Sequence, residues 1–171
     1  SLEMDSLQLG GVDTTVRKTS AVVGKDAHLI IRERILTEKE QEAQTDFVVE
    51  MNGENSSVNL VSRSVARDNS HQAYRSKIVG NAPCAGHSEC DAIIMDHASV
   101  IARPALTANS VDASLIHEAA IGKIAGEQLI KLMTLGLTEK EAEDQIVNGF
   151  LKSVFTTKPA ARPRTEVTTK S

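Results

Sequence analysis

Short runs of apolar and β-branched residues, each followed by a turn signal, dominate the first two thirds of the chain. These runs are His28–Leu36, Asp46–Met51, Ser57–Ala66, His71–Val79, Glu89–Met95, Ser99–Ala108 and Val111–Ile116. Turn signals such as Asp68-Asn69 and Gly80-Asn81 recur about every 12 to 17 residues. Many short strands with no helix between them predict a sandwich, a barrel or a solenoid. The periodicity does not choose among the three, because no strict repeat of residue types is visible.

Two polar stretches interrupt this strand pattern. Asn52-Gly53 lies between two strand-like runs and predicts a tight turn, because this dipeptide readily supplies the positive φ that such turns need. The charged run Thr37–Gln44 fits either a short helix or a solvated turn, and we favour the turn. Residues 1–27 are mixed, with short apolar pieces around a Gly10-Gly11 break, so the strand pattern is expected to start near residue 12.

Helical periodicity begins near residue 118. The segment Glu118–Leu135 contains a cluster of apolar residues at helical spacing, and Gly136 directly after it is a typical left-handed cap. Gly122 and Gly126 weaken the first half of this segment, so two short helices fit as well as one. The apolar cluster consists of Leu129, Ile130, Leu132 and Met133.

A second helix is predicted over Thr138–Val154. Thr138 and Glu141 have the spacing of a capping box, in which each side chain binds a backbone N–H near the other residue. The apolar stripe behind the box is Ala142, Ile146, Val147, Phe150, Leu151 and Val154. Beyond it the chain has two prolines and no periodicity, as in a disordered tail. We therefore expect a β core over residues 1–116, a helical region over 117–155 and a disordered tail over 156–171.

Composition narrows the class of protein. A chain of 171 residues is long enough for one domain with a buried core, and only 2% of its residues are aromatic. Such a core is filled by Val, Ile, Leu and Ala, which suits closely stacked strands. The net charge of −4 argues against a nucleic-acid-binding surface. The sequence also contains neither of the glycine-rich phosphate-binding motifs GxGxxG and GxxxxGK[ST], so we expect no bound nucleotide.

The compartment is predicted from the cysteines and from the apolar runs. Two cysteines are too few for a disulfide framework and fit a reducing compartment, so we expect a cytoplasmic protein. No apolar run approaches the roughly 20 residues that span a bilayer, and the N-terminus does not resemble a signal peptide. The first residue is Ser rather than Met, which indicates a fragment or a processed chain.

The segment from Cys84 to Cys90 has the composition of a metal site. Thiolate and imidazole are ligands that soft and borderline metals prefer, and His87 lies midway between the two cysteines. In a single strand both cysteines would share one face and His87 would point to the other. The three side chains would converge only if residues 83–86 formed a loop. The alternative is one cysteine buried in a strand and the other in a turn.

His117 and Glu118 lie where the strand pattern gives way to helices. Because neighbouring residues on a strand face opposite sides, at most one of the two can point toward Cys90 unless the backbone turns there. Alternatively, Glu118 simply favours a helix N-terminus and His117 is an ordinary polar residue at an edge. No Ser/His/Asp arrangement can be deduced from the spacing.

Several segments of the chain resemble the C-terminal core of the SufB/SufD family of iron–sulfur cluster assembly proteins. They are TDFVVEMNG, SVNLVSRSVARDNSHQAYRS, GHSECDAIIMD and LIHEAAIGKIAGEQLIKLMTLGLTEKEAEDQIVNGFL, within about residues 13–154. The resemblance implies a right-handed parallel β-helix with C-terminal α-helices, whose subunits pair through the β-helix. It also implies that the helices dock an ABC-type ATPase called SufC. The chain lacks the long N-terminal region of SufB and is similar to short SufD-like members.

The same resemblance assigns candidate residues. A Cys in a CDS-like context and a Glu in an HEA context correspond to Cys90 and Glu118, and His117 matches a neighbouring functional His. These three are the expected ligands of iron or of a transient iron–sulfur cluster. Cys84 and His87 are weaker candidates, which rest on their residue types and not on the resemblance. The residues expected to bind a partner are Ile146, Phe150 and Leu151.

From these assignments we expect a non-enzymatic scaffold subunit that receives iron and sulfur while its SufC-like partner hydrolyses ATP. Its other expected partners are sulfur donor proteins and a SufB/SufD-type paralogue, or a second copy of itself as a dimer. The alternative is a purely structural β-helix interaction module without a cluster. A small metal-dependent hydrolase is disfavoured, because no general base beside an open metal position can be identified.

Overall fold

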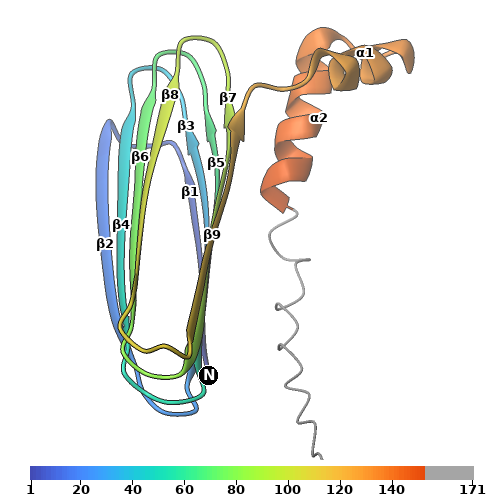
Figure 1. Ribbon diagram of the computed structural model, residues 1–171. Helices are drawn as coiled ribbons and strands as arrows, with labels where there is room; N and C mark the ends of the chain where they lie inside the picture. Colours follow the sequence, from blue (N-terminus) through green and yellow to red (C-terminus); the bar gives the residue numbers. More distant parts are fainter. Residues whose placement is uncertain (153–171) are drawn as a thin grey trace, which may run out of the picture.

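The structure, a computed structural model, describes residues 1–152 and contains two parallel β-sheets and two helices (Figure 1). The strands are β1 (Leu2–Leu9), β2 (Thr14–Val23), β3 (His28–Thr37), β4 (Glu42–Met51), β5 (Ser56–Ala66), β6 (His71–Gly80), β7 (Cys84–Ile94), β8 (Ser99–Ala108) and β9 (Ala113–Gly122). The helices are α1 (Gly126–Thr134) and α2 (Glu139–Lys152). The expected tail over residues 156–171 lies outside the described residues, as does the expected helix end at Val154.

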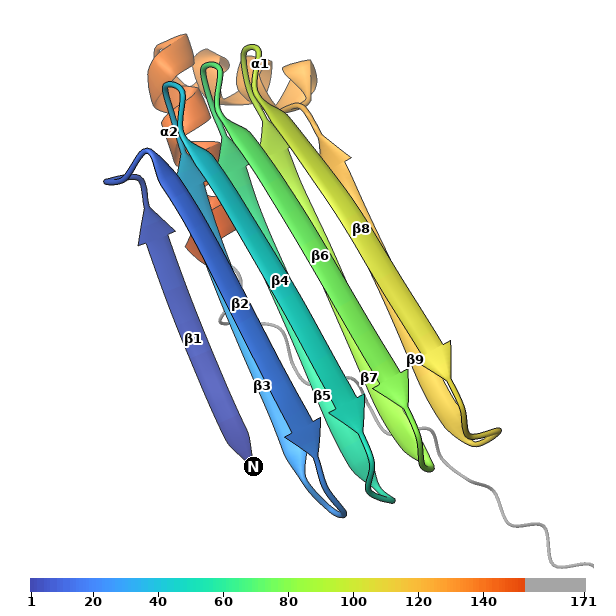
Figure 2. The same cartoon turned by 90° about the vertical axis from the view of Figure 1, so that its left-hand side faces the viewer.

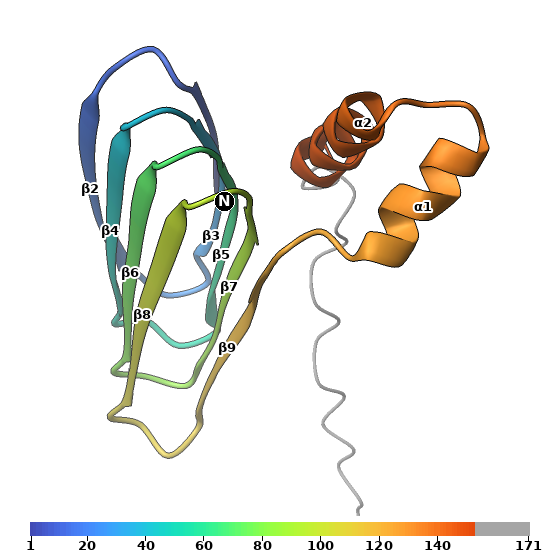
Figure 3. The same cartoon turned by 90° about the horizontal axis from the view of Figure 1, so that it is seen from above.

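Successive strands alternate between the two sheets, so the chain winds as a solenoid (Figures 2 and 3). Sheet A has the order β1-β3-β5-β7-β9, and sheet B has the order β2-β4-β6-β8. Every pair of neighbouring strands is parallel, and each strand pairs with the strand two further along the chain. This confirms the mainly β, parallel solenoid with C-terminal helices and excludes an antiparallel sandwich.

The core lies between the two sheets and consists mainly of aliphatic side chains. Alternate residues of each strand point inward, which buries Leu29 and Ile31 on β3, Val49 and Met51 on β4, and Leu60 on β5. Two aromatic residues of the core, Phe47 and Tyr74, have ring centroids 6.0 Å apart. The low aromatic content of the sequence therefore fits a thin interior that small branched side chains fill.

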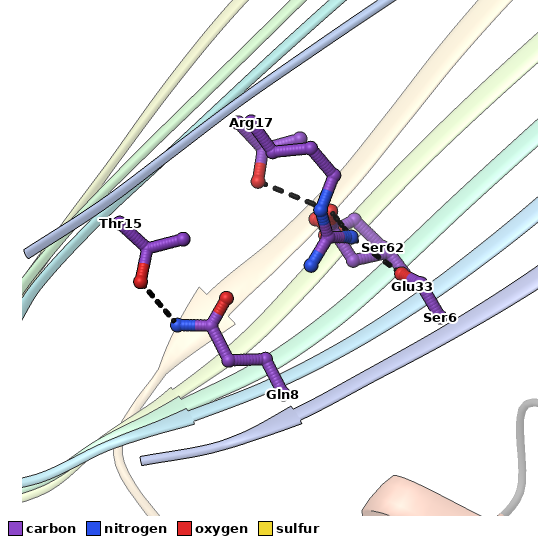
Figure 4. A network of polar contacts seen from close by, with 7 residues as sticks. Ser6, Gln8, Thr15, Arg17, Glu33 and Ser62 are labelled. Carbon is purple, nitrogen blue, oxygen red and sulfur yellow. Dashed lines mark hydrogen bonds and ion pairs between the residues drawn. The ribbon is translucent and has the colours of Figure 1, made fainter. Parts of the chain in front are cut away.

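A polar cluster interrupts this apolar interior near the first turn of the solenoid (Figure 4). The carboxylate of Glu33 is 0% exposed and lies 2.8 Å from the Arg17 guanidinium. It also accepts hydrogen bonds from the hydroxyls of Thr45 at 3.1 Å and Ser62 at 3.0 Å. Burial outweighs these favourable contacts and raises the pKa of Glu33 above its ordinary value. This carboxylate therefore depends on Arg17 to remain ionised inside the protein.

Single residues at equivalent positions of successive turns mark the repeat of the solenoid. Asn52, Asn81 and Asn109 stack in a ladder in which each side-chain amide donates to the preceding side-chain carbonyl at 2.7 Å. The members are 28 or 29 residues apart. Asp26, Asn55 and other turn residues adopt positive φ, a conformation that Asn and Asp tolerate better than most residues. The sequence thus has a structural period, although no strict repeat of residue types was visible in it.

The turn at Asn52-Gly53 is present, but our interpretation of it was wrong. It joins β4 of sheet B to β5 of sheet A, and the positive φ of 56° belongs to Asn55 rather than to either member of the dipeptide. Gly53 is needed for a different reason. A Cβ atom there would lie 1.9 Å from the backbone nitrogen of Lys25, in the preceding turn of the solenoid.

Three other segments test the predicted boundaries. Residues 1–27, expected to be mixed, contain β1 and β2, so the solenoid begins well before residue 12. Within the charged run Thr37–Gln44 the turn covers only residues 38–41, because Thr37 ends β3 and residues 42–44 begin β4. The favoured turn is therefore confirmed in part, and the helix is excluded. The strand β9 continues to Gly122, and the first helix therefore starts at Gly126 rather than at Glu118. The predicted helix start was wrong because these residues extend the pairing with β7.

Both helices lie on the outer side of sheet A (Figure 3). Val147 and Leu151 of α2 pack with Val65 of β5, and half-buried Phe150 joins this cluster. The Arg63 guanidinium lies 5.7 Å from the centre of the Phe150 ring. The predicted capping box is confirmed by the 2.8 Å bond that the Thr138 N–H donates to the Glu141 carboxylate. No helix within residues 1–152 is long and apolar enough to cross a bilayer.

Candidate functional site

The strands β7 and β9 carry all five candidate ligands, and their pairing decides where each one points. In the parallel register Ser88 lies opposite His117, Glu89 opposite Glu118, and Cys90 opposite Ala119. Because side chains alternate between the two faces of a sheet, Cys84, Cys90 and His117 face the interior of the solenoid. His87 and Glu118 face outward. The structure therefore brings Cys90 and His117 to one side and separates Glu118 from them.

Cys90 is an inward-facing thiol with 1% of its surface exposed. Burial, together with the negative charges of Asp91 and Glu33, raises its pKa to about 12. Cys84 is also buried, and desolvation raises its pKa as well. Both cysteines are free and lie within β7, so the alternative with one of them in a turn is wrong. A metal ion that binds Cys90 has to displace the thiol proton.

His117 lies on the same inner face as Cys90, two residues along the neighbouring strand. Strand spacing and rise put the two Cα atoms about 8 Å apart, which allows both side chains to reach a shared ion or small cluster. Both ring nitrogens of His117 are shielded from water, and neither makes a well-formed hydrogen bond with any residue that the structure describes. Burial and the nearby His87 lower the pKa of His117, which favours the neutral ring that binds metals.

Glu118 lies on the outer face of sheet A beside His87. The Glu118 carboxylate oxygen Oε2 is 3.3 Å from His87 Nε2, and Glu89 is the third member of the group. One potential ligand atom from each of the three residues lies within 4.8 Å of the other two. The sequence interpretation missed Glu89, although its spacing of two residues from His87 on a strand signals a shared face.

Charged side chains extend the group of His87, Glu89 and Glu118 toward the helices. Arg63 on β5 contacts Glu89 at 3.2 Å and Asp91 at 3.7 Å. Burial and the neighbouring Glu89 raise the pKa of Asp91 to about 6. Because Arg63 also lies against Phe150, the carboxylates of β7 are linked to the position of α2.

Sheet A already covers part of the side chains that we expected to bind a partner. Leu151 is buried and Phe150 is half-buried, and both pack in the cluster under α2. Ile146 is half-buried, whereas Ile130 and Met133 of α1 are exposed. The described part of the chain thus offers more free apolar surface on α1 than on α2.

Comparison with known proteins gives a consistent result. Residues 1–150 match the family model described as SUF system FeS cluster assembly, SufBD core domain. An iron–sulfur cluster assembly SufBD family protein of Methanocaldococcus jannaschii is 37% identical over 147 residues, which cover 85% of this chain and 46% of that protein.

Two further archaeal relatives have the same description. The one from Methanothermobacter thermautotrophicus is 33% identical over 143 residues, covering 82% of this chain and 35% of the relative. The one from Archaeoglobus fulgidus is 36% identical over 135 residues, covering 78% of this chain and 36% of the relative. The chain spans less than half the length of each of these three proteins.

Proposed function

The chain belongs to the SufBD family of iron–sulfur cluster assembly proteins, and on that premise we propose that it is a scaffold that holds iron and sulfur during assembly. Cys90, as a thiolate, would bind the substrate iron, because cysteine thiolates are the usual ligands of iron–sulfur clusters. Alternatively, it would accept sulfur by attacking the outer sulfur of a persulfide on a sulfur donor protein, whose own thiolate then leaves. His117 would supply a second ligand from the same face. The observation that carries the proposal is the placement of Cys90 and His117 together on the inner face of β7 and β9.

Access to Cys90 is the physical requirement of this proposal. Most residues of β8 and β9, the strands of the last described coil of the solenoid, are exposed. Ala119 of β9 lies opposite Cys90 in the register. Loading of iron or sulfur onto Cys90 therefore needs movement of β8 and β9, together with loss of the Cys90 proton. Glu118 would then be reached from the outer side of the sheet rather than together with the thiol.

Anaerobic reconstitution with iron and sulfide tests the scaffold proposal. We expect broad visible absorption in the parent protein and its loss in Cys90→Ser, because a serine hydroxyl keeps its proton far more strongly and binds iron much less readily than a thiolate. Cys84→Ser is the matched control, since Cys84 is a buried thiol at the far end of the same strand. If the parent forms no chromophore, or if Cys90→Ser keeps it, the chain is better described as a structural interaction module.

The partners that we propose also rest on membership of the SufBD family. A SufC-like ABC ATPase would dock on the C-terminal helices, and a SufB/SufD-type paralogue or a second copy would pair through the solenoid. Sulfur donor proteins would deliver to Cys90. Both cysteines are unpaired thiols, which fits a reducing cytoplasm as the place of action. The scaffold itself would perform no enzymatic step.

Two substitutions separate docking from stability. Ile130→Asp on α1 should reduce co-purification with the ATPase without changing the melting temperature, because Ile130 is 61% exposed. Phe150→Ala should instead lower the free energy of unfolding by about 2 to 3 kcal/mol, because its ring packs against the sheet. A pull-down beside a thermal melt measures both effects. If Ile130→Asp leaves the pull-down unchanged, α1 does not dock the ATPase.

A further inference from the structure

The group His87, Glu89 and Glu118 has an internal conflict that an ion would resolve. His87 Nδ1 lies 2.9 Å from the side-chain carbonyl oxygen of Asn59, and that oxygen can only accept, so Nδ1 carries the proton. In a neutral ring Nε2 then presents a lone pair. It faces the Glu118 carboxylate oxygen at 3.3 Å, which leaves two acceptors opposed. Either a second proton on the ring or a cation between the two atoms removes this repulsion.

The arrangement has features that metal sites use to orient a histidine ligand. A hydrogen bond from one ring nitrogen to a carbonyl fixes the tautomer and aims the other nitrogen at the metal, and Asn59 provides this bond. Glu89 contacts Arg63 through Oε1 and also interacts with the Asp91 carboxyl, and these neighbours hold its side chain on this face of the sheet. The register places Glu89 of β7 directly opposite Glu118 of β9, and His87 lies on the same face two residues before Glu89.

The distances fit a single ion after small side-chain movements. Ligand atoms around one ion with bonds of about 2.1 Å stand about 3 Å apart. The His87–Glu118 separation of 3.3 Å is close to that value, and the whole group lies within 4.8 Å. Rotation of two flexible glutamate side chains covers the remaining difference. Three protein ligands, of which His87 and Glu89 are half-buried and Glu118 is exposed, would leave the other coordination positions open to exchange.

We propose that His87, Glu89 and Glu118 bind one divalent first-row metal ion on the outer face of sheet A. One imidazole and two carboxylates without sulfur suit Fe²⁺, Mn²⁺ or Co²⁺. The site is separate from Cys90, whose side chain lies on the opposite face of the sheet. That the ion is the iron substrate rests on the proposed scaffold function, whereas the binding of a divalent ion does not.

Titration of the metal-free chain with Mn²⁺ tests this site. Electron paramagnetic resonance of the free hydrated ion reports how much Mn²⁺ remains unbound near neutral pH. We expect one ion to bind per chain, and we expect His87→Ala and Glu118→Gln each to weaken binding at least about tenfold. Glu118 is exposed, so its amide variant should fold normally, and a thermal melt checks this.

Two controls distinguish a metal site from general surface charge. His71→Ala removes an exposed histidine outside the group, whose Nδ1 contacts Ser99 on sheet B, and it should leave Mn²⁺ binding unchanged. Asn59→Ala should weaken binding about tenfold if this residue orients His87, whereas Asn59→Asp, which keeps an acceptor oxygen, should retain it.

The outcomes also separate this site from the scaffold proposal. Cys90→Ser should bind Mn²⁺ like the parent even where it no longer assembles a cluster. The inference is overturned if the parent binds no Mn²⁺, or if His87→Ala and Glu118→Gln bind it with parental affinity. His87 and Glu118 would then form an ordinary ion pair with a protonated ring, and a chromophore that depends on Cys90 would be unaffected by that result.

Discussion

Gly53→Ala is expected to destabilise the protein by about 4 kcal/mol or more, enough to prevent folding of a marginally stable chain. The added Cβ would lie 1.9 Å from the Lys25 nitrogen and 2.1 Å from the Gly24 carbonyl carbon. Both atoms belong to the backbone, so no side-chain rotation relieves the overlap. Two stacked turns of the solenoid would have to separate at this point, and urea unfolding followed by circular dichroism measures the loss.

Gly24→Ala provides a matched control within the same contact. No heavy atom lies within 4 Å of a Cβ built on Gly24, and its φ is not positive. We expect its free energy of unfolding to stay within about 0.5 kcal/mol of the parent value. If Gly53→Ala behaves like Gly24→Ala, the turns of the solenoid are not in close contact at this position.

Arg17→Ala is expected to lower the free energy of unfolding by about 2 to 3 kcal/mol above neutral pH, because it leaves the buried Glu33 carboxylate without its cation. The loss should be below that of a fully buried pair, since the Arg17 side chain is 26% exposed. Lys18→Ala, at the neighbouring outward-facing position, should have little effect. Chemical denaturation over a range of pH measures all three proteins.

The pH dependence identifies Glu33 as the cause. Its pKa is raised in the folded state above the ordinary 4.5, so the unfolded chain loses this proton first as pH rises. The parent should therefore lose stability as pH rises from about 4.5 through the raised pKa, and Arg17→Ala should lose more over a wider range. Glu33→Gln in the Arg17→Ala background should remove most of the difference. A pH-independent effect of Arg17→Ala would show that its packing, not the charge of Glu33, is responsible.

Local chemistry was sufficient to predict several elements. Short β-branched runs and the turn signals between them placed β5, β6 and β8 closely, because strand residues and turn residues differ in local preference. They placed only the second half of β7, which starts at Cys84 rather than at Glu89. Thr138 and Glu141 marked the start of α2, because a capping box involves residues only one turn apart. The same alternation predicted that Cys84 and Cys90 share a face and that only one of His117 and Glu118 can join them.

The remaining features depended on stacking between turns 28 or 29 residues apart. Gly53 is required by the backbone of the preceding turn, which a local reading of Asn-Gly does not reveal. The strand-to-helix boundary was misplaced because residues 118–122 gain their hydrogen bonds from β7. Glu89 became a candidate ligand only when β9 placed Glu118 beside it. Sequence alone thus determined which side chains of one strand share a face, whereas tertiary pairing decided which face is buried and which residues are neighbours, because those contacts join residues far apart in the chain.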